Sequence, residues 1–93
     1  MKFIVNNKLY DTEKAELLCT FEKPWETKTM LGTMNFYRKT NLYKTAKGAW
    51  FLTSTNDSEN SYIEVISEKR GKKYLMHNAY EKYCEMYGPL EEA

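Results

Sequence analysis

The chain has few of the residues on which enzymes and metal sites depend. Its 93 residues include one histidine and two cysteines, and Cys19 and Cys84 form no CxxC motif. His77, Glu81 and Cys84 would share one predicted helix, but a structural zinc site usually needs four ligands and a catalytic cysteine needs an oriented base. The four glycines are scattered, so no glycine-rich loop that could cradle a phosphate is visible. We therefore expect no catalytic residue, no metal site and no cofactor.

A long apolar run is also missing. No segment approaches the roughly 18 apolar residues that a membrane-spanning helix needs. The apolar start of the chain reaches Asn6 too soon for the core of a signal peptide. A small secreted domain would carry a denser disulfide framework than two distant cysteines. These absences predict a cytoplasmic protein with reduced thiols and no membrane partner.

Acidic residues are absent from residues 27–56, the segment termed here the basic stripe. The whole chain is nearly neutral, with 14 Lys and Arg against 13 Asp and Glu, so its charge is segregated along the sequence. Lysines on strands can contact phosphates, and exposed aromatics can stack on unpaired bases or anchor a protein interface. The alternative is an ordinary hairpin with its aromatics in the core and its lysines in water. The residues expected to contact a partner are Tyr37, Arg38, Lys39, Tyr43, Lys44, Lys47 and Trp50.

The composition predicts one folded domain that covers residues 1–93. A hydrophobic content of 42%, with 15% aromatic residues, is too high for an intrinsically disordered protein. Tyrosine is the most frequent aromatic residue, with eight copies. Its apolar ring and polar hydroxyl suit the faces of sheets and protein interfaces.

The first third of the chain reads as strands. Residues 2–11 predict a β-hairpin, because Asn6-Asn7 can adopt the positive φ angles of a tight turn; the alternative is one strand kinked at this pair. A turn at residues 11–14 and a strand at about residues 16–22 follow from the alternation of side chains, with a short helix as the competing interpretation. Pro24 is expected to end this strand, because it has no amide hydrogen for the ladder.

The next third contains the clearest local signal. Residues 27–40 are predicted to be an irregular loop followed by a strand at about residues 35–39. Residues 42–53 predict a hairpin, in which Gly48 supplies the left-handed residue of a three-residue loop. A polar loop at residues 54–61 and a strand at residues 62–66 should follow.

The last third predicts a charged turn and then a helix. Residues 68–73 are rich in lysine and arginine around Gly71, and we interpret them as a solubilising turn. Residues 74–87 have apolar side chains at helical spacing, with Leu75, Ala79, Tyr83 and Met86 on the face that should meet the sheet. Gly88-Pro89 is a strong stop signal. The order of elements predicts an α+β fold, with a small antiparallel sheet of four to six short strands and a C-terminal amphipathic helix packed on one face.

Two segments resemble a group of small proteins encoded by phages and integrative elements of Gram-positive bacteria. Residues 8–16 read KLYDTEKAE and are similar to that group's start, K-Y-D-T-E-x-A-E. Residues 42–52 read LYKTAKGAWFL and are similar to its hairpin, L-Y-x-T-x-x-G-x-[YW]-F-L. A C-terminal amphipathic helix usually follows in the group. The resemblance carries no catalytic residue.

This resemblance implies a genomic context in which small proteins block host defences. Anti-CRISPR proteins belong to that context, and they typically bind an effector nuclease. The near-neutral charge of this chain departs from inhibitors that mimic DNA with a dense carboxylate surface. The leading prediction is a non-enzymatic binding protein of a phage or mobile element that inhibits a host defence nuclease in the bacterial cytoplasm. The alternative is a small nucleic-acid-binding accessory protein that uses the basic stripe. Exposed sheet edges would also allow a homodimer.

Overall fold

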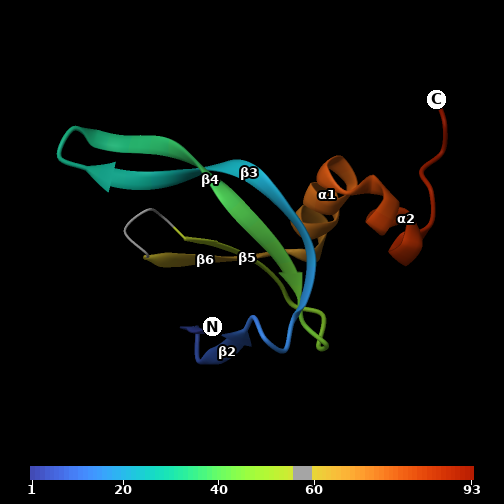
Figure 1. The fold of residues 1–93 in the computed structure, drawn as a ribbon, viewed down its shortest axis with the longest axis horizontal. Coiled ribbons are helices and arrows are strands. Elements are labelled where there is room, and N and C mark those ends of the chain that lie inside the picture. The colour runs from blue at the N-terminus through green and yellow to red at the C-terminus, as the bar shows by residue number, and fades with distance from the viewer. Residues whose placement is uncertain (56–59) are drawn as a thin grey trace.

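The computed structural model describes residues 1–55 and 60–93 and shows an α+β fold (Figure 1). A four-stranded antiparallel sheet has the order β3-β4-β5-β6, and β1 and β2 form a separate two-stranded sheet. Two short helices follow β6. The elements are β1 Lys2–Val5, β2 Lys8–Asp11, β3 Glu16–Thr29, β4 Gly32–Lys44, β5 Trp50–Thr55, β6 Ser61–Ile66, α1 Glu68–Asn78 and α2 Tyr80–Tyr87. The predicted fold class is confirmed.

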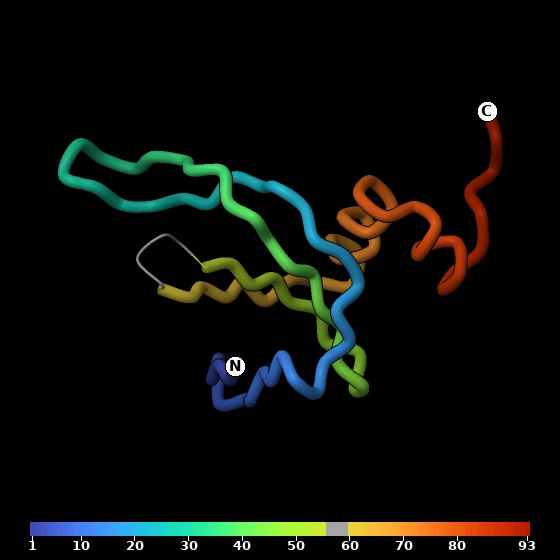
Figure 2. Tube along the Cα trace, in the orientation of Figure 1, coloured from blue at the N-terminus to red at the C-terminus, as the bar shows by residue number. Residues whose placement is uncertain are grey.

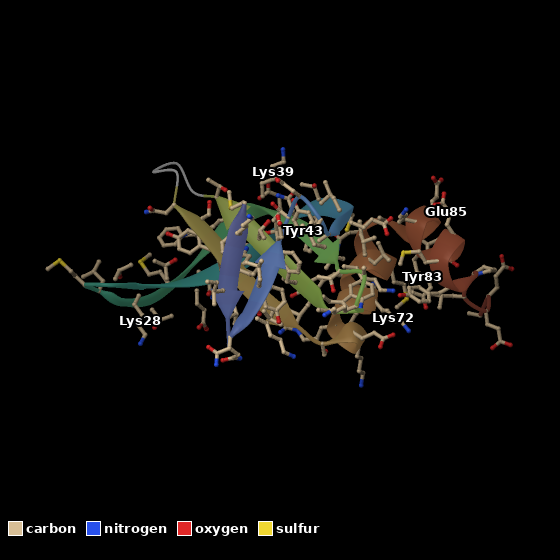
Figure 3. The ribbon with its side chains drawn as sticks, turned by 90° about the horizontal axis from the view of Figure 1, so that it is seen from below. Lys28, Lys39, Tyr43, Lys72, Tyr83 and Glu85 are labelled. Atoms are coloured by element: carbon tan, nitrogen blue, oxygen red, sulfur yellow. The ribbon has the colours of Figure 1, made fainter. Side chains whose placement is uncertain are left out.

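The N-terminal hairpin is confirmed. Asn6 and Asn7 have φ angles of 51° and 61°, and the register places Val5 opposite Lys8. Figure 3 is seen from the side of this hairpin, which crosses in front of the larger sheet. Tyr10 on β2 packs edge-on against Phe51 on β5, with ring centroids 5.4 Å apart. Phe51 alternates along β5 with residues that face α1, so the hairpin and α1 cover opposite faces of the sheet.

The predicted break at Pro24 is wrong, because β3 continues through it to Thr29. Pro24 lies opposite Tyr37 of β4, and β3 is an edge strand of the described sheet. A proline without an amide hydrogen is tolerated on an edge strand, where only one side of the strand pairs.

The predicted irregular loop within residues 27–40 is also wrong. Thr29 pairs with Gly32, and Met30-Leu31 form a tight turn between the two strands. The Thr29 hydroxyl accepts the amide hydrogen of Leu31 at 3.2 Å and donates to the carbonyl of Gly32 at 2.8 Å. Gly32 has a φ of 109°, a conformation that residues with side chains rarely adopt, so the chain can reverse there.

The second hairpin and β6 agree with the sequence analysis. The Thr45 amide donates to the carbonyl of Ala49 at 2.8 Å, and Gly48 has a φ of 89°. The predicted polar loop is shorter than expected, because β5 extends to Thr55 and β6 begins at Ser61. The part of that prediction on residues 56–59 lies outside the described residues.

The predicted charged turn at residues 68–73 is wrong, because these residues form the first half of α1. Ser67 is its N-cap, and the Ser67 hydroxyl accepts the amide hydrogen of Arg70 at 3.1 Å. Lys72 forms an ion pair with Glu68 one turn earlier at 2.9 Å. Gly71 is buried against the ring of Trp50, and a Cβ at this position would overlap the indole. The glycine that suggested a turn is therefore a packing requirement.

The predicted helix at residues 74–87 is interrupted. Ala79 has φ −151° and ψ 64°, and it separates α1 from α2. The predicted apolar face is confirmed: Leu75 is buried, and Ala79, Tyr83 and Met86 pack against the core. The helix ends before Gly88, as the sequence predicts.

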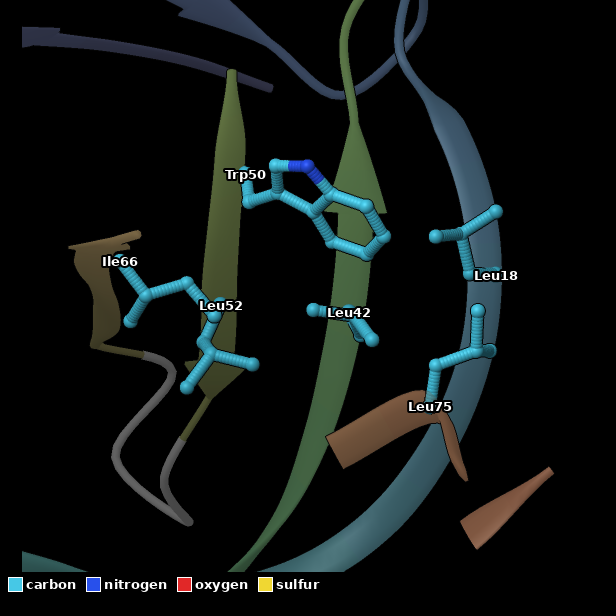
Figure 4. Packing of buried hydrophobic residues seen from close by; sticks show 6 residues of the cluster. All are labelled: Leu18, Leu42, Trp50, Leu52, Ile66 and Leu75. Atoms are coloured by element: carbon cyan, nitrogen blue, oxygen red, sulfur yellow. The ribbon is translucent and has the colours of Figure 1, made fainter. Parts of the chain in front are cut away.

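The main core lies between the sheet and α1. Figure 4 shows its six buried side chains, with the Trp50 ring beside Leu42 and above Leu75. An irregular register between Leu17 and Cys19 interrupts the β3–β4 ladder, and Leu18 at this irregularity joins the core. The cluster consists of Leu18, Leu42, Trp50, Leu52, Ile66 and Leu75.

Candidate functional site

The most prominent surface feature is a two-stranded arm built from β3 and β4. β4 pairs with β5 only from Thr40 onward, so residues 22–39 continue as a ribbon of two strands. Figure 2 shows this ribbon extending away from the helices. The arm contributes to an elongated molecule, with extents of 47 × 32 × 21 Å.

The outer part of the arm exposes large apolar side chains. Met30 and Leu31 at the turn are almost fully exposed, and Tyr37 is 74% exposed. Met34 and Phe36 add partly exposed apolar surface on β4. Five large exposed apolar side chains therefore lie within residues 30–37, a concentration that differs from the scattered single apolar residues normal on a protein surface. We therefore take the arm as the candidate functional site.

The base of the arm is held by side-chain contacts. The Trp25 indole donates to the hydroxyl of Thr40 at 2.9 Å. The guanidinium of Arg38 lies 4.5 Å from the ring centroid of Tyr62 on β6 and donates to the hydroxyl of Thr27 at 3.1 Å. These contacts join both strands of the arm to the body, so its base is ordered before any partner arrives.

Lys23 adds a third contact at the same base. Its ammonium lies 3.3 Å from the carboxylate of Glu64 and 4.4 Å from the centroid of the Trp25 ring. The Glu64 carboxylate also accepts a bond from Arg70 on α1 at 3.2 Å. One carboxylate thus connects β3, β6 and α1.

The seven residues predicted to contact a partner lie in three different places. Tyr37, Arg38 and Lys39 lie on the arm, but Arg38 is occupied by Thr27 and Tyr62. Lys47 is exposed in the β4–β5 turn, at the opposite end of β4. The basic stripe is therefore not one continuous surface.

The remaining three residues are part of the packed body. The prediction is wrong for Trp50, which is 1% exposed and lies in the core. Tyr43 stacks on Phe51 with ring centroids 5.1 Å apart, on the face covered by the N-terminal hairpin. Lys44 on β4 donates to the hydroxyl of Tyr87 on α2 at 3.4 Å. The rings of Trp50 and Tyr43 mainly stabilise the sheet, as the alternative interpretation stated.

The acid-free segment does not form a strongly basic surface, because β3 supplies carboxylates across the ladder. Glu22 lies opposite Lys39, and Glu16 lies opposite Lys44. Figure 3 shows Lys28 and Lys39 projecting toward opposite sides of the molecule. Strand pairing therefore reduces a charge segregation that is pronounced in the sequence.

The lysines and the arginine of residues 68–73, which were interpreted as a solubilising turn, lie on α1. The ring centroid of Tyr87 lies 4.4 Å from the Lys72 ammonium and 5.8 Å from the Lys44 ammonium. A lysine of α1 and a lysine of the basic stripe therefore contact the same ring. The hydrogen bond with Glu68 raises the pKa of Lys72, and the same bond lowers the pKa of Glu68. These lysines stabilise the contact between α2 and the body.

In residues 1–55 and 60–93, no group of three or more His, Cys, Asp or Glu side chains could hold a metal ion. Within the same residues, no helix is long and apolar enough to cross a membrane. Both cysteines are free, and burial raises the pKa of the Cys19 thiol.

Sequence reasoning missed Met30, Leu31, Met34 and Phe36 as surface residues. They lie in the segment interpreted as an irregular loop and a short strand, after the break expected at Pro24. A signal was present in Thr29 and Gly32, which flank two residues at the spacing of a tight hairpin turn.

Comparison with known proteins adds no relative. No protein family, curated protein or solved structure matches this chain. The origin in a phage or mobile element remains a prediction from the two resembling segments.

Proposed function

We propose that this chain is a non-enzymatic binding protein of a phage or mobile element that docks its arm onto a host defence nuclease. The observation that carries the binding role is the exposed apolar surface of the arm. The identity of the target depends on the resemblance to small proteins of Gram-positive phages and integrative elements.

The chemistry of the arm suits a protein partner. Methionine and aromatic side chains are enriched at protein interfaces, and burying apolar surface contributes about 25 cal/mol per Å². Met30, Leu31 and Tyr37 can enter a groove of the partner without first leaving a packed environment. The contacts of Trp25 and Arg38 hold the base in place, which lowers the entropy lost on binding.

The charges of the arm favour a protein over a nucleic acid. Binding to phosphates relies on clustered lysine and arginine side chains. On the arm, Lys39 faces Glu22 across the ladder, and Arg38 is already stacked on Tyr62. A partner surface with apolar side chains and little excess charge is the best match to this arrangement.

The direct test is capture of the tagged protein's partner from a nuclease-treated lysate of the bacterial host. The double variant Met30→Ser, Leu31→Ser should lose the captured partner. Ile4→Ser is the matched control, because Ile4 is also an exposed apolar residue but lies on β1. Equal capture by both variants would contradict the role of the arm.

Inhibition is tested with the captured partner after its purification. If the partner is a defence nuclease, the wild-type protein should suppress its DNA cleavage, and the double variant should not. A captured partner without nuclease activity would overturn the proposed target.

The nucleic-acid alternative is tested by fluorescence anisotropy with single-stranded and double-stranded oligonucleotides near physiological salt. The proposed function predicts no tight binding by the isolated protein. Sub-micromolar binding that weakens steeply with salt would instead support the accessory protein, because such dependence reports release of counterions from phosphates.

A further inference from the structure

A pocket of 630 Å³ lies between the N-terminal hairpin and the β4–β5 turn, away from the arm. Its size is within the range of small-molecule sites in proteins. Lys8, Lys14 and Lys47 line this pocket, although they are far apart in the sequence. Only Lys47 belongs to the basic stripe.

Each lysine is placed by a hydrogen-bonded turn. Lys8 follows the Asn6-Asn7 turn directly. The Lys14 amide donates to the carbonyl of Asp11 at 3.2 Å, which closes the turn between β2 and β3. Lys47 lies in the turn closed by Thr45 and Ala49. The backbone therefore fixes the positions from which the three side chains reach the pocket.

The pocket has no ion-pair partner for these cations. In the described part of the chain, no carboxylate lies within ion-pair distance of Lys8, Lys14 or Lys47. Asp11 also lines the pocket, but it is buried, and its side chain accepts the amide hydrogen of Glu13 at 3.0 Å. An anion in the pocket would give these lysines a partner of opposite charge.

Part of the remaining lining is apolar. Leu9 and Ala46 line the pocket, and Leu9 is an exposed leucine on β2. Tyr10 also lines it and is held in place by its contact with Phe51. A ligand that combines several negative charges with a less polar body would use both kinds of wall.

We propose that this pocket binds a phosphate-bearing small molecule of the nucleotide class. Lysine ammonium groups are common ligands of phosphates, and Lys8, Lys14 and Lys47 would receive the phosphate groups. The nucleoside would lie against Leu9 and Ala46. This site is separate from the arm, so the inference does not depend on the proposed function.

The test is calorimetric titration of the full chain with ATP and with inorganic tripolyphosphate near physiological salt, followed by amide chemical-shift mapping. Lys14→Gln and Lys47→Gln should each weaken ATP binding roughly three- to tenfold. Lys28→Gln is the matched control, because it removes the same charge from the arm, and its affinity should stay within about twofold of wild type. Circular dichroism confirms that each variant is folded.

A second pair of measurements tests the apolar wall. Leu9→Ser should weaken ATP binding and leave tripolyphosphate binding unchanged. Met30→Ser, Leu31→Ser should bind ATP like the wild type, which separates this site from the arm. The proposal is overturned by absence of ATP binding up to about 1 mM, by an equal loss in the Lys28→Gln control, by tripolyphosphate binding as tight as ATP binding, or by shifts outside the pocket.

Discussion

At the scale of single residues, the same residue type has different roles at different places. Gly32 and Gly48 provide positive φ angles in turns, whereas Gly71 lies inside a helix against Trp50. Sequence reasoning identified the turn at Gly48, because strand-forming residues flank it. It misread Gly71, because glycine is required there by the contact with Trp50. Trp50 lies 21 positions earlier in the sequence, so no local pattern indicates this requirement.

Gly71→Ala tests this packing. Helix propensity alone would make the variant more stable by up to about 1 kcal/mol. Overlap of the new methyl group with the Trp50 indole should instead destabilise the protein by about 1–3 kcal/mol. Denaturant unfolding measures the difference, and Lys69→Ala on the exposed side of α1 should change stability by less than about 0.5 kcal/mol. A more stable Gly71→Ala variant would contradict the contact.

Cys19 gives a pH-dependent prediction. Burial raises the pKa of its thiol, so the folded state favours the protonated form. Its contribution to stability is therefore complete below the pKa of the unfolded chain and is lost as the pH rises through the higher folded pKa.

Alkylation of a Cys84→Ser variant checks this pKa. The rate for Cys19 in the folded protein should rise at higher pH than in the chain unfolded by denaturant, because the thiolate is the reactive form. Identical pH profiles for the folded and unfolded chain would contradict the shift.

At the scale of secondary-structure elements, local signals located most of the strands, but not their full length. Asn6, Asn7 and Gly48 belong to residue types that readily adopt the positive φ angles of hairpin turns. Both hairpins could therefore be predicted. The length of β3 could not, because Pro24 is compatible with an edge strand, and edge position is a property of the whole sheet. Tyr37, Arg38 and Lys39 of the candidate site were predicted, but its outer part was missed for the same reason, since the arm exists only when β3 and β4 extend past β5.

The start of α1 is tested at its cap. Ser67→Ala removes the acceptor for the Arg70 amide and should cost about 1 kcal/mol in the free energy of unfolding. Ser67→Asp retains an acceptor at this position and should keep most of the stability. If both variants were as stable as the wild type, the helix would not depend on this cap.

At the scale of the whole molecule, the chain is a small body with a long projection. The radius of gyration is 14.5 Å, whereas a compact domain of this length would have about 12 Å. The six buried residues of the main core cluster all lie outside residues 22–39, and Trp25 at the base of the arm packs against this cluster. The body should therefore fold without the outer part of the arm.

A shortened arm tests this separation. Replacing residues 28–33 with Asn-Gly joins Thr27 and Met34, which already face each other in the ladder, by a two-residue hairpin turn. This variant should remain folded, show a smaller radius of gyration in X-ray scattering, and lose partner capture while it keeps ATP binding. Loss of cooperative unfolding would show that the arm is needed for the fold.

The turn at Met30-Leu31 also has a consequence for chain continuity. It is fully exposed, and the strands on each side are joined by an antiparallel ladder that runs from Thr29 and Gly32 back to the body. A protease that cuts at Lys28 would therefore leave two fragments held together by that ladder and by the core contacts of β3 and β4. The tip of the arm is the natural place to split this protein into two complementing halves or to open it for a circular permutant.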